Sequence, residues 1–450
     1  MARKVFLSVL GAGFYDKCKY SKERECFCSS ETRFIQVATL ECLKANDWNE
    51  GDAVYVLLTE KARKLNWLTS ESGKRKKFPD GPEEDYKGLE DELKKMDLKV
   101  GNKIDQDIPN GSDEDQMWDI FKVLFDLIED GDELYVDLTH SFRYIPMLMM
   151  VFCNYAKFLK NIQVKSITYG NYEERYDGIA PIVDITVLSV LQDWTAAADE
   201  FLSTGNVNKL SRLYMPQIHE RLRYSSGSDE EAQLLKSFVK NLNSLVNELK
   251  LCQGKRLIEA CTINDTKQSI DEIEQVEKPK PFEPLLNEIK KSVQAFDNQN
   301  NVKNGIAAAK WCSDNGLYQQ AATLLQESVV SMVCELIGLD WQKEIKRKYV
   351  NNAFNILADK KKTNNKNQWD IPSDSECDEE ERKRIIEQII SLKEVQDLVK
   401  DFSTLTAYRN KINHGTMLEG QGQFRNVDTI ADDIKNLTER IYNLTYCTSL

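Results

Sequence analysis

Arg409, Asn410 and His414 lie within one short stretch of the chain, Arg-Asn-Lys-Ile-Asn-His, and Gly415 follows it directly. An arginine can neutralise a phosphate that is being cleaved, a histidine can transfer a proton near neutral pH, and an asparagine can orient either group by hydrogen bonds. Together these are the groups needed to cut RNA without a metal ion. The alternative without a catalytic role is that they lie at the end of a surface helix and pair with some of the 73 acidic residues.

Helical geometry relates these three side chains to one another. Asn410 and His414 are four residues apart and share a helix face, whereas Arg409 lies about 140° from His414. The glycine at 415 predicts a helix C-terminus at His414. The arginine must therefore reach around the helix, or the helix must end there.

A second group of residues whose side chains could bind a ligand or take part in a reaction lies between 137 and 143. Thr139, His140, Ser141 and Arg143 place two hydroxyls, an imidazole and a guanidinium in one turn after a predicted strand. Such a turn suits a ligand that carries phosphate. Thr139 and Ser141 could instead cap the next helix, and Arg143 could pair with Asp137.

Two further loops carry glycines. Gly11 and Gly13 follow the first predicted strand and allow the backbone to approach a phosphate or a ribose, although the third glycine of the dinucleotide fingerprint is missing. Tyr169 and Gly170 end another predicted strand, and the tyrosine could stack on a base. We expect the three loops to meet at one edge of a sheet.

Alternating β-rich runs and amphipathic patterns before residue 190 predict the elements that position these loops. Strands are expected at 5–10, 53–59, 133–138 and 164–169, with a poorer run at 98–104, and helices at 32–44, 116–129 and 146–160. Strands this apolar are covered on both faces. The expected fold is a Rossmann-like α/β domain with a parallel sheet, which binds ligands at the carboxyl ends of its strands.

Helical periodicity replaces the strand pattern from about residue 187, for example at 234–251, 316–337 and 386–402, and predicts an all-α second half. Prolines within 275–284 indicate a break between helices. The acidic segment 364–384 is expected to be a solvated loop, and the basic run 74–77 suits either contact with a polyanion or a surface loop.

Composition narrows the class of protein. A chain of 450 residues fits two domains, and its net charge of −13 argues against nonspecific coating of nucleic acid, which needs a basic face. Without a secretory signal, the eleven cysteines are expected to be reduced thiols in the cytoplasm. Cys18, Cys26 and Cys28 cluster, but with no histidine nearby they form a poor metal site. No apolar run is long enough to cross a bilayer, so we expect no membrane contact.

The motifs resemble two known domain families. Residues 10–15 (Leu-Gly-Ala-Gly-Phe-Tyr), 32–36 (Thr-Arg-Phe-Ile-Gln), 118–121 (Trp-Asp-Ile-Phe) and 137–143 (Asp-Leu-Thr-His-Ser-Phe-Arg) resemble the CARF sensor domains of type III CRISPR systems. Residues 311–321 (Trp-Cys-Ser-Asp-Asn-Gly-Leu-Tyr-Gln-Gln-Ala) and 409–414 resemble their HEPN ribonuclease domains. The resemblance predicts a CARF domain at 1–190, a helical connector at 191–285 and a HEPN domain at 286–450.

The resemblance implies a homodimer activated by a cyclic oligoadenylate. A two-fold ring suits a two-fold dimer, and the motifs do not distinguish the cyclic tetra-adenylate from the hexa-adenylate. The implied ligand contacts are Gly11, Gly13, Phe14, Thr139, His140, Ser141 and Arg143, with Tyr169 and Gly170 beside them. The hydroxyls and imidazole at 139–141 raise the further hypothesis that the sensor slowly cleaves its own activator.

The resemblance also implies an endoribonuclease that needs no metal or other cofactor and cuts single-stranded RNA. The RNA 2′-hydroxyl would attack the adjacent phosphorus and leave a 2′,3′-cyclic phosphate and a 5′-hydroxyl. His414 would transfer the proton, Arg409 would stabilise the phosphoryl charge, and Asn410 would orient either group. Because one histidine is too few for separate acid and base roles, we expect a site shared by two protomers.

Three alternatives belong to other classes. A ligand-responsive transcriptional regulator needs a recognition helix with a basic face, which the acidic helical half does not clearly offer. A metal-dependent nuclease needs carboxylates gathered at a sheet edge, and no sheet is expected in the second half. A HEPN domain that binds partners without cutting RNA stays open.

Overall fold

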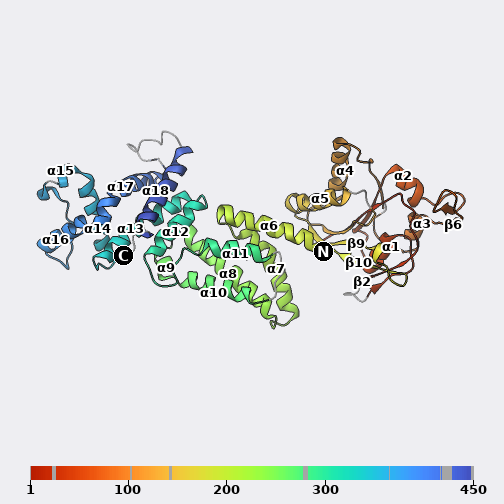
Figure 1. Cartoon of the computed structure of the whole chain (residues 1–450), viewed down its shortest axis with the longest axis horizontal. Helices are drawn as coiled ribbons and strands as arrows, with labels where there is room; N and C mark the ends of the chain where they lie inside the picture. The colour runs from red at the N-terminus through yellow and green to blue at the C-terminus, as the bar shows by residue number, and fades with distance from the viewer. Residues whose placement is uncertain are drawn as a thin grey trace. The chain divides into compact units, whose positions relative to one another are not determined.

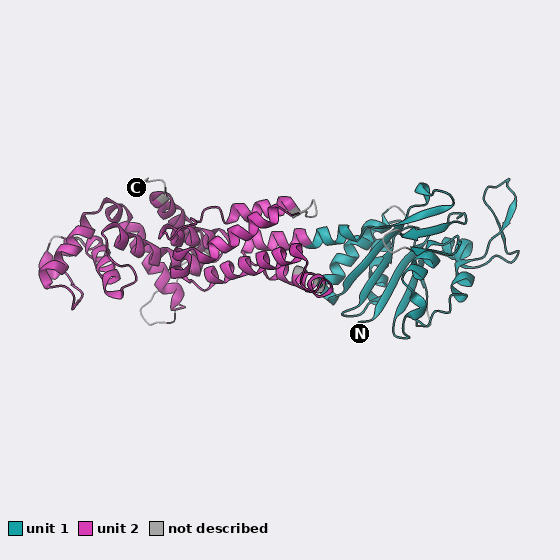
Figure 2. Ribbon diagram, turned by 90° about the horizontal axis from the view of Figure 1, so that it is seen from below, with its two compact units in different colours: residues 1–193 teal, residues 194–450 magenta. Residues whose placement is uncertain are grey.

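The computed structural model describes residues 2–22, 27–101, 104–140, 144–276, 282–363, 365–415, 417 and 428–446. The chain divides into two compact units, Met1–Asp193 and Trp194–Leu450 (Figure 2). All the strands of the described residues belong to the first unit, and the second is built of helices and loops (Figure 1).

Five parallel strands make up one side of the eight-stranded sheet in the order β7-β4-β1-β8-β9, with β7 at the edge. They are β1 (Lys4–Leu10), β4 (Ala53–Leu58), β7 (Asp105–Asp107), β8 (Glu133–Asp137) and β9 (Gln163–Gly170). The chain first adds strands on one side of β1 and then on the other, so the order reverses between β1 and β8. In sheets of this type ligands bind at that switch point, beyond the carboxyl ends of the strands.

Three short strands extend the sheet beyond β9. They are β10 (Ile179–Asp184), which is antiparallel to β9, followed by β2 (Lys19–Lys22) and β3 (Phe27–Cys28). A separate hairpin, β5 (Lys74–Lys76) with β6 (Glu83–Asp85), lies in the segment between β4 and β7.

Helices cover both faces of the sheet. The helical elements of the first unit are α1 (Ile35–Cys42), η2 (Ala45–Asp47), α2 (Glu60–Ala62), η3 (Arg63–Trp67), α3 (Leu89–Lys94), α4 (Glu114–Leu127), α5 (Ile145–Lys160) and η4 (Tyr172–Glu174). Alternate residues of β1 enter opposite cores: Val5, Leu7 and Val9 pack with α4 and α5, whereas Phe6 and Leu10 pack with α1 and α3. The predicted parallel α/β sheet with two buried faces is therefore confirmed.

One strand of the first unit lies elsewhere than expected, and the basic run forms part of a hairpin. The strand expected at 98–104 lies further on, at Asp105–Asp107, because Leu98, Val100 and Ile104 pack as partly buried side chains into the core beside α1. The basic run at 74–77 is not simply a surface loop either. It contains β5, and Arg75 turns back onto the loop after β1.

The second unit consists of a series of helices that begins within α6. They are α6 (Thr186–Thr204), α7 (Asn208–Tyr224), α8 (Glu230–Lys250), α9 (Gly254–Glu259), α10 (Cys261–Glu274), α11 (Phe282–Ser292), α12 (Lys303–Asp314), α13 (Tyr318–Leu336), α14 (Glu344–Ala358), α15 (Lys360–Thr363), η5 (Lys366–Gln368), α16 (Glu379–Ser391), α17 (Lys393–Asn413) and α18 (Asp428–Tyr446). The predicted break at 275–284 is confirmed, since α10 ends at Glu274 and α11 begins at Phe282. Every helix among the described residues is too short or too polar to span a bilayer.

The acidic segment 364–384 is not a solvated loop throughout, as expected, because its acidic end is helical. Its charged end is the first turn of α16, where Asp378 accepts a hydrogen bond from the Glu381 N–H at 2.8 Å. Acidic side chains are favoured there by the helix dipole, so the run 378–381 starts a helix. The helical pattern at 386–402 also comprises two helices, which Leu392 separates.

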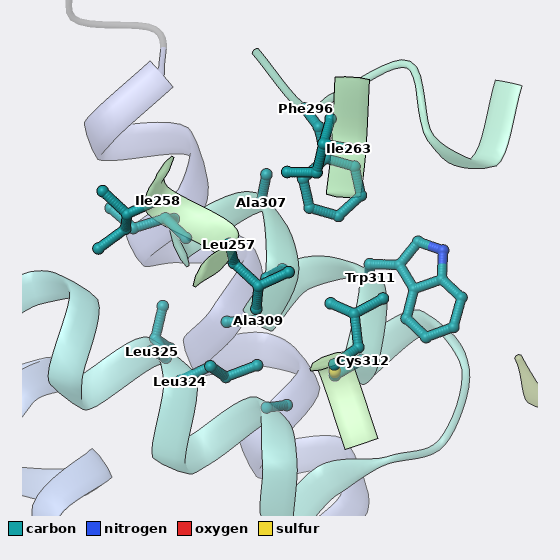
Figure 3. Close-up of a cluster of buried hydrophobic side chains, with 14 of the residues drawn as sticks. Leu257, Ile258, Ile263, Phe296, Ala307, Ala309, Trp311, Cys312, Leu324 and Leu325 are labelled. Carbon is teal, nitrogen blue, oxygen red and sulfur yellow. The ribbon is translucent and has the colours of Figure 1, made fainter. Parts of the chain in front are cut away.

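Close packing of α12 on α13 forms part of the helical core. Figure 3 shows the side chains of this cluster, which include Leu257 and Ile258 of α9, Trp311 and Cys312 of α12, and Leu324 of α13. A side chain on Gly305 would meet the Ser328 hydroxyl at 2.2 Å, so the glycine permits the two helices to approach.

Candidate functional site

The loops after β1, β8 and β9 gather at one edge of the sheet. Strand register places Ser8 beside Asp137 and Asp137 beside Thr168, so these strands end together. One hollow of about 280 Å³ is lined by residues 9–13, Tyr15, Thr139 and His140. A neighbouring hollow of about 230 Å³ is lined by Phe14, Tyr15, Asp16, Tyr20, Thr139, His140, Tyr169, Gly170, Tyr172 and Glu173.

These two hollows bring together every predicted ligand residue that the structure describes. They are Gly11, Gly13, Phe14, Thr139, His140, Tyr169 and Gly170. Ser141 and Arg143 lie outside the described residues. Ligand contact by these residues stays a prediction, but their assembly at the switch point is a property of the fold.

Thr139 ties the ends of two strands together. Its hydroxyl donates to the Asp137 carboxylate at 2.5 Å and accepts from the Gly170 N–H at 2.8 Å. Burial raises the pKa of Asp137, which also accepts from the Ser8 hydroxyl at 2.7 Å. The alternative that Thr139 caps the next helix is wrong, because α5 begins with Tyr144 at its N-cap.

His140 presents an unsatisfied imidazole beside an aromatic ring. Its ring stacks on Tyr15 with 3.9 Å between centroids and 16° between planes. Nε2 is buried and has no hydrogen-bond partner among the described residues. Burial lowers the pKa of His140 to about 3, so the ring is neutral near pH 7. A neutral imidazole can hydrogen-bond a ligand but contributes no charge to holding its phosphates.

Two of the predicted glycines are required by space. A Cβ on Gly11 would lie 2.5 Å from the Tyr15 hydroxyl and 3.5 Å from the His140 carbonyl oxygen. A Cβ on Gly170 would lie 2.6 Å from the Ile35 side chain. Gly11 therefore keeps the hollow open, whereas Gly170 allows β9 to pack on α1.

Asn66 and Arg75 also contact this site, although no sequence motif predicts either residue. The buried Asn66 amide donates to the carbonyls of Gly11 and Gly13 at 2.7 and 2.8 Å. Arg75 donates to the Ala12 carbonyl at 3.1 Å. No local motif marks these residues, since the contacts join segments more than fifty residues apart.

The predicted catalytic stretch lies at the end of α17. The helix ends at Asn413, His414 is the exposed cap residue, and Gly415 follows with a φ of +60°. The N–H of His414 donates to the Asn410 carbonyl at 3.0 Å. The predicted helix end at His414 is confirmed.

Arg409 is held on two sides. Its Nη1 donates to Asn410 Oδ1 at 3.2 Å, and its Nη2 contacts Glu327 Oε1 at 3.2 Å. Glu327 also pairs with Arg347 at 2.6 Å. Nε of Arg409 is buried and has no acceptor in the described part of the chain. The arginine thus has an acidic partner, as the surface alternative expects, and also a free donor that a phosphate oxygen could satisfy.

The two segments that resemble HEPN domains lie together. Gln319, in the first turn of α13, donates to Asn413 Oδ1 at 3.4 Å. Within the described residues no hydrogen bond joins Arg409 to His414. The side chains of the predicted catalytic residues Arg409 and His414 are therefore not joined directly in this part of the chain.

Among the described residues, no group of three or more His, Cys, Asp or Glu side chains is placed so that it could hold a metal ion. Cys18 is buried with a free thiol, and Cys26 lies outside the described residues.

A largely parallel sheet with its crevice at the switch point defines the first unit as a doubly wound α/β domain. Residues 5–173 match the family model of the CARF domain of the CRISPR system endoribonuclease Csx1. The predicted CARF domain is thereby confirmed. The match ends at residue 173, so the HEPN nature of the second unit and the domain boundaries stay predictions.

A relative carries the similarity further along the chain. The CRISPR-associated protein MJ1674 of Methanocaldococcus jannaschii is 31% identical over 271 residues, which make up 57% of this chain and 39% of that protein. The match thus spans about two fifths of the relative's length. Because the aligned residues outnumber those of the first unit, the similarity reaches into the helical unit.

Proposed function

We propose that the protein is a metal-independent endoribonuclease of CRISPR antiviral defence, which cleaves single-stranded RNA when its first unit binds a cyclic oligoadenylate. The observation that carries the proposal is the end of α17, where Arg409 is hydrogen-bonded to Asn410 and an exposed His414 caps the same helix. Similarity to the Csx1 CARF domain and to a CRISPR-associated protein supports the cellular role.

The proposed reaction is an internal transesterification. The RNA 2′-oxygen attacks the adjacent phosphorus as its proton leaves, and the bond to the 5′-oxygen breaks, giving a 2′,3′-cyclic phosphate and a 5′-hydroxyl. His414 transfers a proton at one of these oxygens. The free Nε–H of Arg409 donates to the phosphoryl oxygens as their charge grows, and Asn410 steadies the guanidinium.

The crevice of the first unit suits an adenylate ring. Tyr169 is 39% exposed at the rim of one hollow, where a base can stack on it, and the glycine loop borders the other hollow. His140 adds an unsatisfied nitrogen without adding charge.

A homodimer is the proposed assembly. Helix α5 carries an apolar stripe of exposed side chains at helical spacing: Met147, Val151, Tyr155, Phe158 and Leu159. Phe158 is 84% exposed. Contiguous apolar surface of this kind is typical of an interface, and a second copy of the same stripe is a complementary partner.

Cleavage of labelled RNA in EDTA, with and without synthetic cyclic tetra- and hexa-adenylate, tests the function. We expect one ring to activate cleavage and His414→Ala to abolish it, because the substituted residue cannot transfer a proton. His219→Ala, which removes a histidine of α7, is the matched control and should leave cleavage intact. Cleavage that persists in His414→Ala, or that requires a divalent metal, contradicts the mechanism.

The second candidate is a ligand-binding regulator that does not cut RNA. The contact of Arg409 with Glu327 favours it, because that contact already occupies part of the guanidinium. In the same assay such a protein binds the ring and leaves the RNA whole.

Slow cleavage of the activator is a separate hypothesis. It predicts linear adenylates after long incubation with the protein, and recovery of the intact ring contradicts it.

A further inference from the structure

Three successive carbonyl groups of the loop after β1 are turned toward the same two side chains. Asn66 donates to the carbonyls of Gly11 and Gly13 at 2.7 and 2.8 Å. Arg75 donates to the Ala12 carbonyl at 3.1 Å and to the Gly13 carbonyl at 3.2 Å. The whole loop is therefore oriented by groups outside it.

The amide N–H groups of the loop consequently point the other way. In a trans peptide the C=O and the following N–H project in opposite directions, and the described residues contain no cis peptide. Since the carbonyls of 11, 12 and 13 face Asn66 and Arg75, the N–H groups of Ala12, Gly13 and Phe14 face away from them. Successive N–H groups on one side of a loop form a concave site for an anion.

A hollow lies on that free side of the loop. The hollow of about 280 Å³ is lined by the loop, Tyr15, Thr139 and His140, and neither Asn66 nor Arg75 reaches it. For the N–H groups of Ala12 and Phe14, no hydrogen-bond acceptor is present among the described residues. Ala12 and the unpaired His140 Nε2 therefore border this hollow, and Phe14 lines the neighbouring hollow of about 230 Å³, which His140 also lines.

An oxygen atom already sits against the loop amides. The N–H groups of Gly11 and Gly13 face the Tyr15 hydroxyl, and although burial raises the pKa of Tyr15, these amides partly offset that rise. The hydroxyl thus takes a place suited to a negatively charged oxygen.

Asn66 and Arg75 are themselves fixed. The Asn66 carbonyl oxygen accepts from the Tyr86 hydroxyl at 2.7 Å and from Arg75, so its two N–H donors must face the loop. The Arg75 guanidinium lies 5.0 Å from the centre of the Tyr86 ring and 5.6 Å from that of Phe14. Such prior ordering reduces the cost of binding.

We propose that Asn66 and Arg75 are positioning residues of the ligand site: they turn the N–H groups of Ala12, Gly13 and Phe14 toward the side on which one phosphodiester of a nucleotide ligand can bind. The identity of the nucleotide as a cyclic adenylate rests on the proposed function. That side of the loop, the phosphate subsite, rests on the orientation of the loop.

Hydrogen–deuterium exchange and calorimetry with the full-length protein test this subsite. Cyclic tetra- or hexa-adenylate should slow exchange of the amides at 12–14 in the wild type. Asn66→Ala and Arg75→Lys should weaken binding by about tenfold, the loss expected for one or two buried hydrogen bonds. At ligand saturation the variants should show less protection at 12–14 while the exchange of β8 is unchanged, a difference that general destabilisation does not produce.

Lys76→Ala is the matched control, because Lys76 is an exposed cation on the same strand as Arg75. It removes a charge without touching the loop, so its affinity should stay within about twofold of the wild type. Equal affinity in Asn66→Ala and the wild type, or protection that avoids 12–14, overturns the subsite and leaves the ribonuclease proposal standing.

Inorganic pyrophosphate separates the two proposals if no cyclic adenylate binds. Protection of 12–14 by pyrophosphate in the wild type but not in Asn66→Ala supports the subsite and rejects the proposed activator. If pyrophosphate gives no protection either, the subsite is overturned as well.

Discussion

The buried environment of His140 keeps its imidazole uncharged near pH 7. An imidazole in water has a pKa near 6.5, but burial against Tyr15 lowers the pKa of His140 to about 3. The folded protein therefore resists protonation of this residue, whereas the unfolded chain accepts a proton near pH 6.5. Its contribution to stability is fully present above pH 6.5 and decreases as the pH falls toward 3.

Carbon-13 labelling of the three histidines tests this by nuclear magnetic resonance. The His140 signal, assigned with a His140→Gln variant, should stay constant between pH 5 and pH 8. The ring is neutral throughout that range because burial disfavours the cation. A signal that titrates with a midpoint near 6.5 contradicts the buried environment.

Glu327 is the shared partner of Arg347 and Arg409. Together with Asn410 it holds the Arg409 guanidinium from two directions, so we assign it a positioning role. Its half-exposed carboxylate stabilises the fold by only about 0–1 kcal/mol. Its importance should therefore appear in the reaction rate rather than in stability.

Under the proposed mechanism, Glu327→Gln should lower kcat about tenfold, because a loosened arginine is poorly aligned with the phosphate. KM for RNA should not rise, since a negative charge near the substrate is removed. Glu335→Gln makes the same charge change at an exposed residue of α13 and is the control. A higher kcat in Glu327→Gln means that the ion pair restrains the enzyme.

Among the elements, α5 combines two roles. Its buried face, with Met149, Phe152 and Cys153, packs on the sheet, and its other face is the apolar stripe that we assign to the dimer. The helix begins directly after the segment that follows His140. A dimer formed through α5 therefore places an interface close to the ligand loops.

If the proposed dimer forms through α5, Val151→Lys should convert it into a monomer, because the substitution introduces a charge into the middle of the stripe, which the interface would have to bury. Analytical ultracentrifugation measures the change. Leu251→Lys substitutes a residue that is 69% exposed outside the stripe, at the end of α8, and should leave the assembly unchanged. Equal dissociation of both variants, or of neither, excludes α5 as the contact.

Several elements could be predicted from sequence because their patterns are local. The runs that became β1, β4, β8 and β9 are apolar and end in distinctive loops. β7 is polar, Asp-Gln-Asp, and forms only because β4 lies beside it. β10 could not be predicted because it contains Pro181. A proline has no N–H to donate to a neighbouring strand, so it argues against a strand in a sequence.

The candidate site divides in the same way. Gly11, Thr139 and His140 follow strand ends, so topology alone brings them together. Asn66 and Arg75 act through long-range contacts with backbone atoms, which leave no signature in the sequence around them. In the sequence, Arg75 stands between Lys74 and Lys76, so nothing distinguishes it from the other residues of an exposed basic run.

At the scale of the whole molecule, the number of catalytic groups per chain matters. One chain supplies one His414 and a single Arg409, and no hydrogen bond joins the two among the described residues. A site completed by a second protomer resolves this shortage and agrees with the proposed dimer. Activation then requires a ligand that binds better to the dimer arrangement in which the two halves meet.

Mixed dimers test the shared site. When wild-type and His414→Ala chains are exchanged in equal amounts, random pairing leaves about a quarter of the dimers fully wild type. If both histidines are needed, ligand-activated cleavage falls to about that quarter. If each chain works alone, about half of the activity remains, and the shared site is excluded.

The hold of Asn66 and Arg75 on the glycine loop has an evolutionary consequence. Both residues lie in the segment between β4 and β7, outside the space that a ligand would enter. Under the proposed function, substitutions in that segment can therefore adjust how strongly the first unit responds to its ligand while every atom facing the ligand stays the same. Sensitivity to a signal and recognition of that signal can then be selected separately.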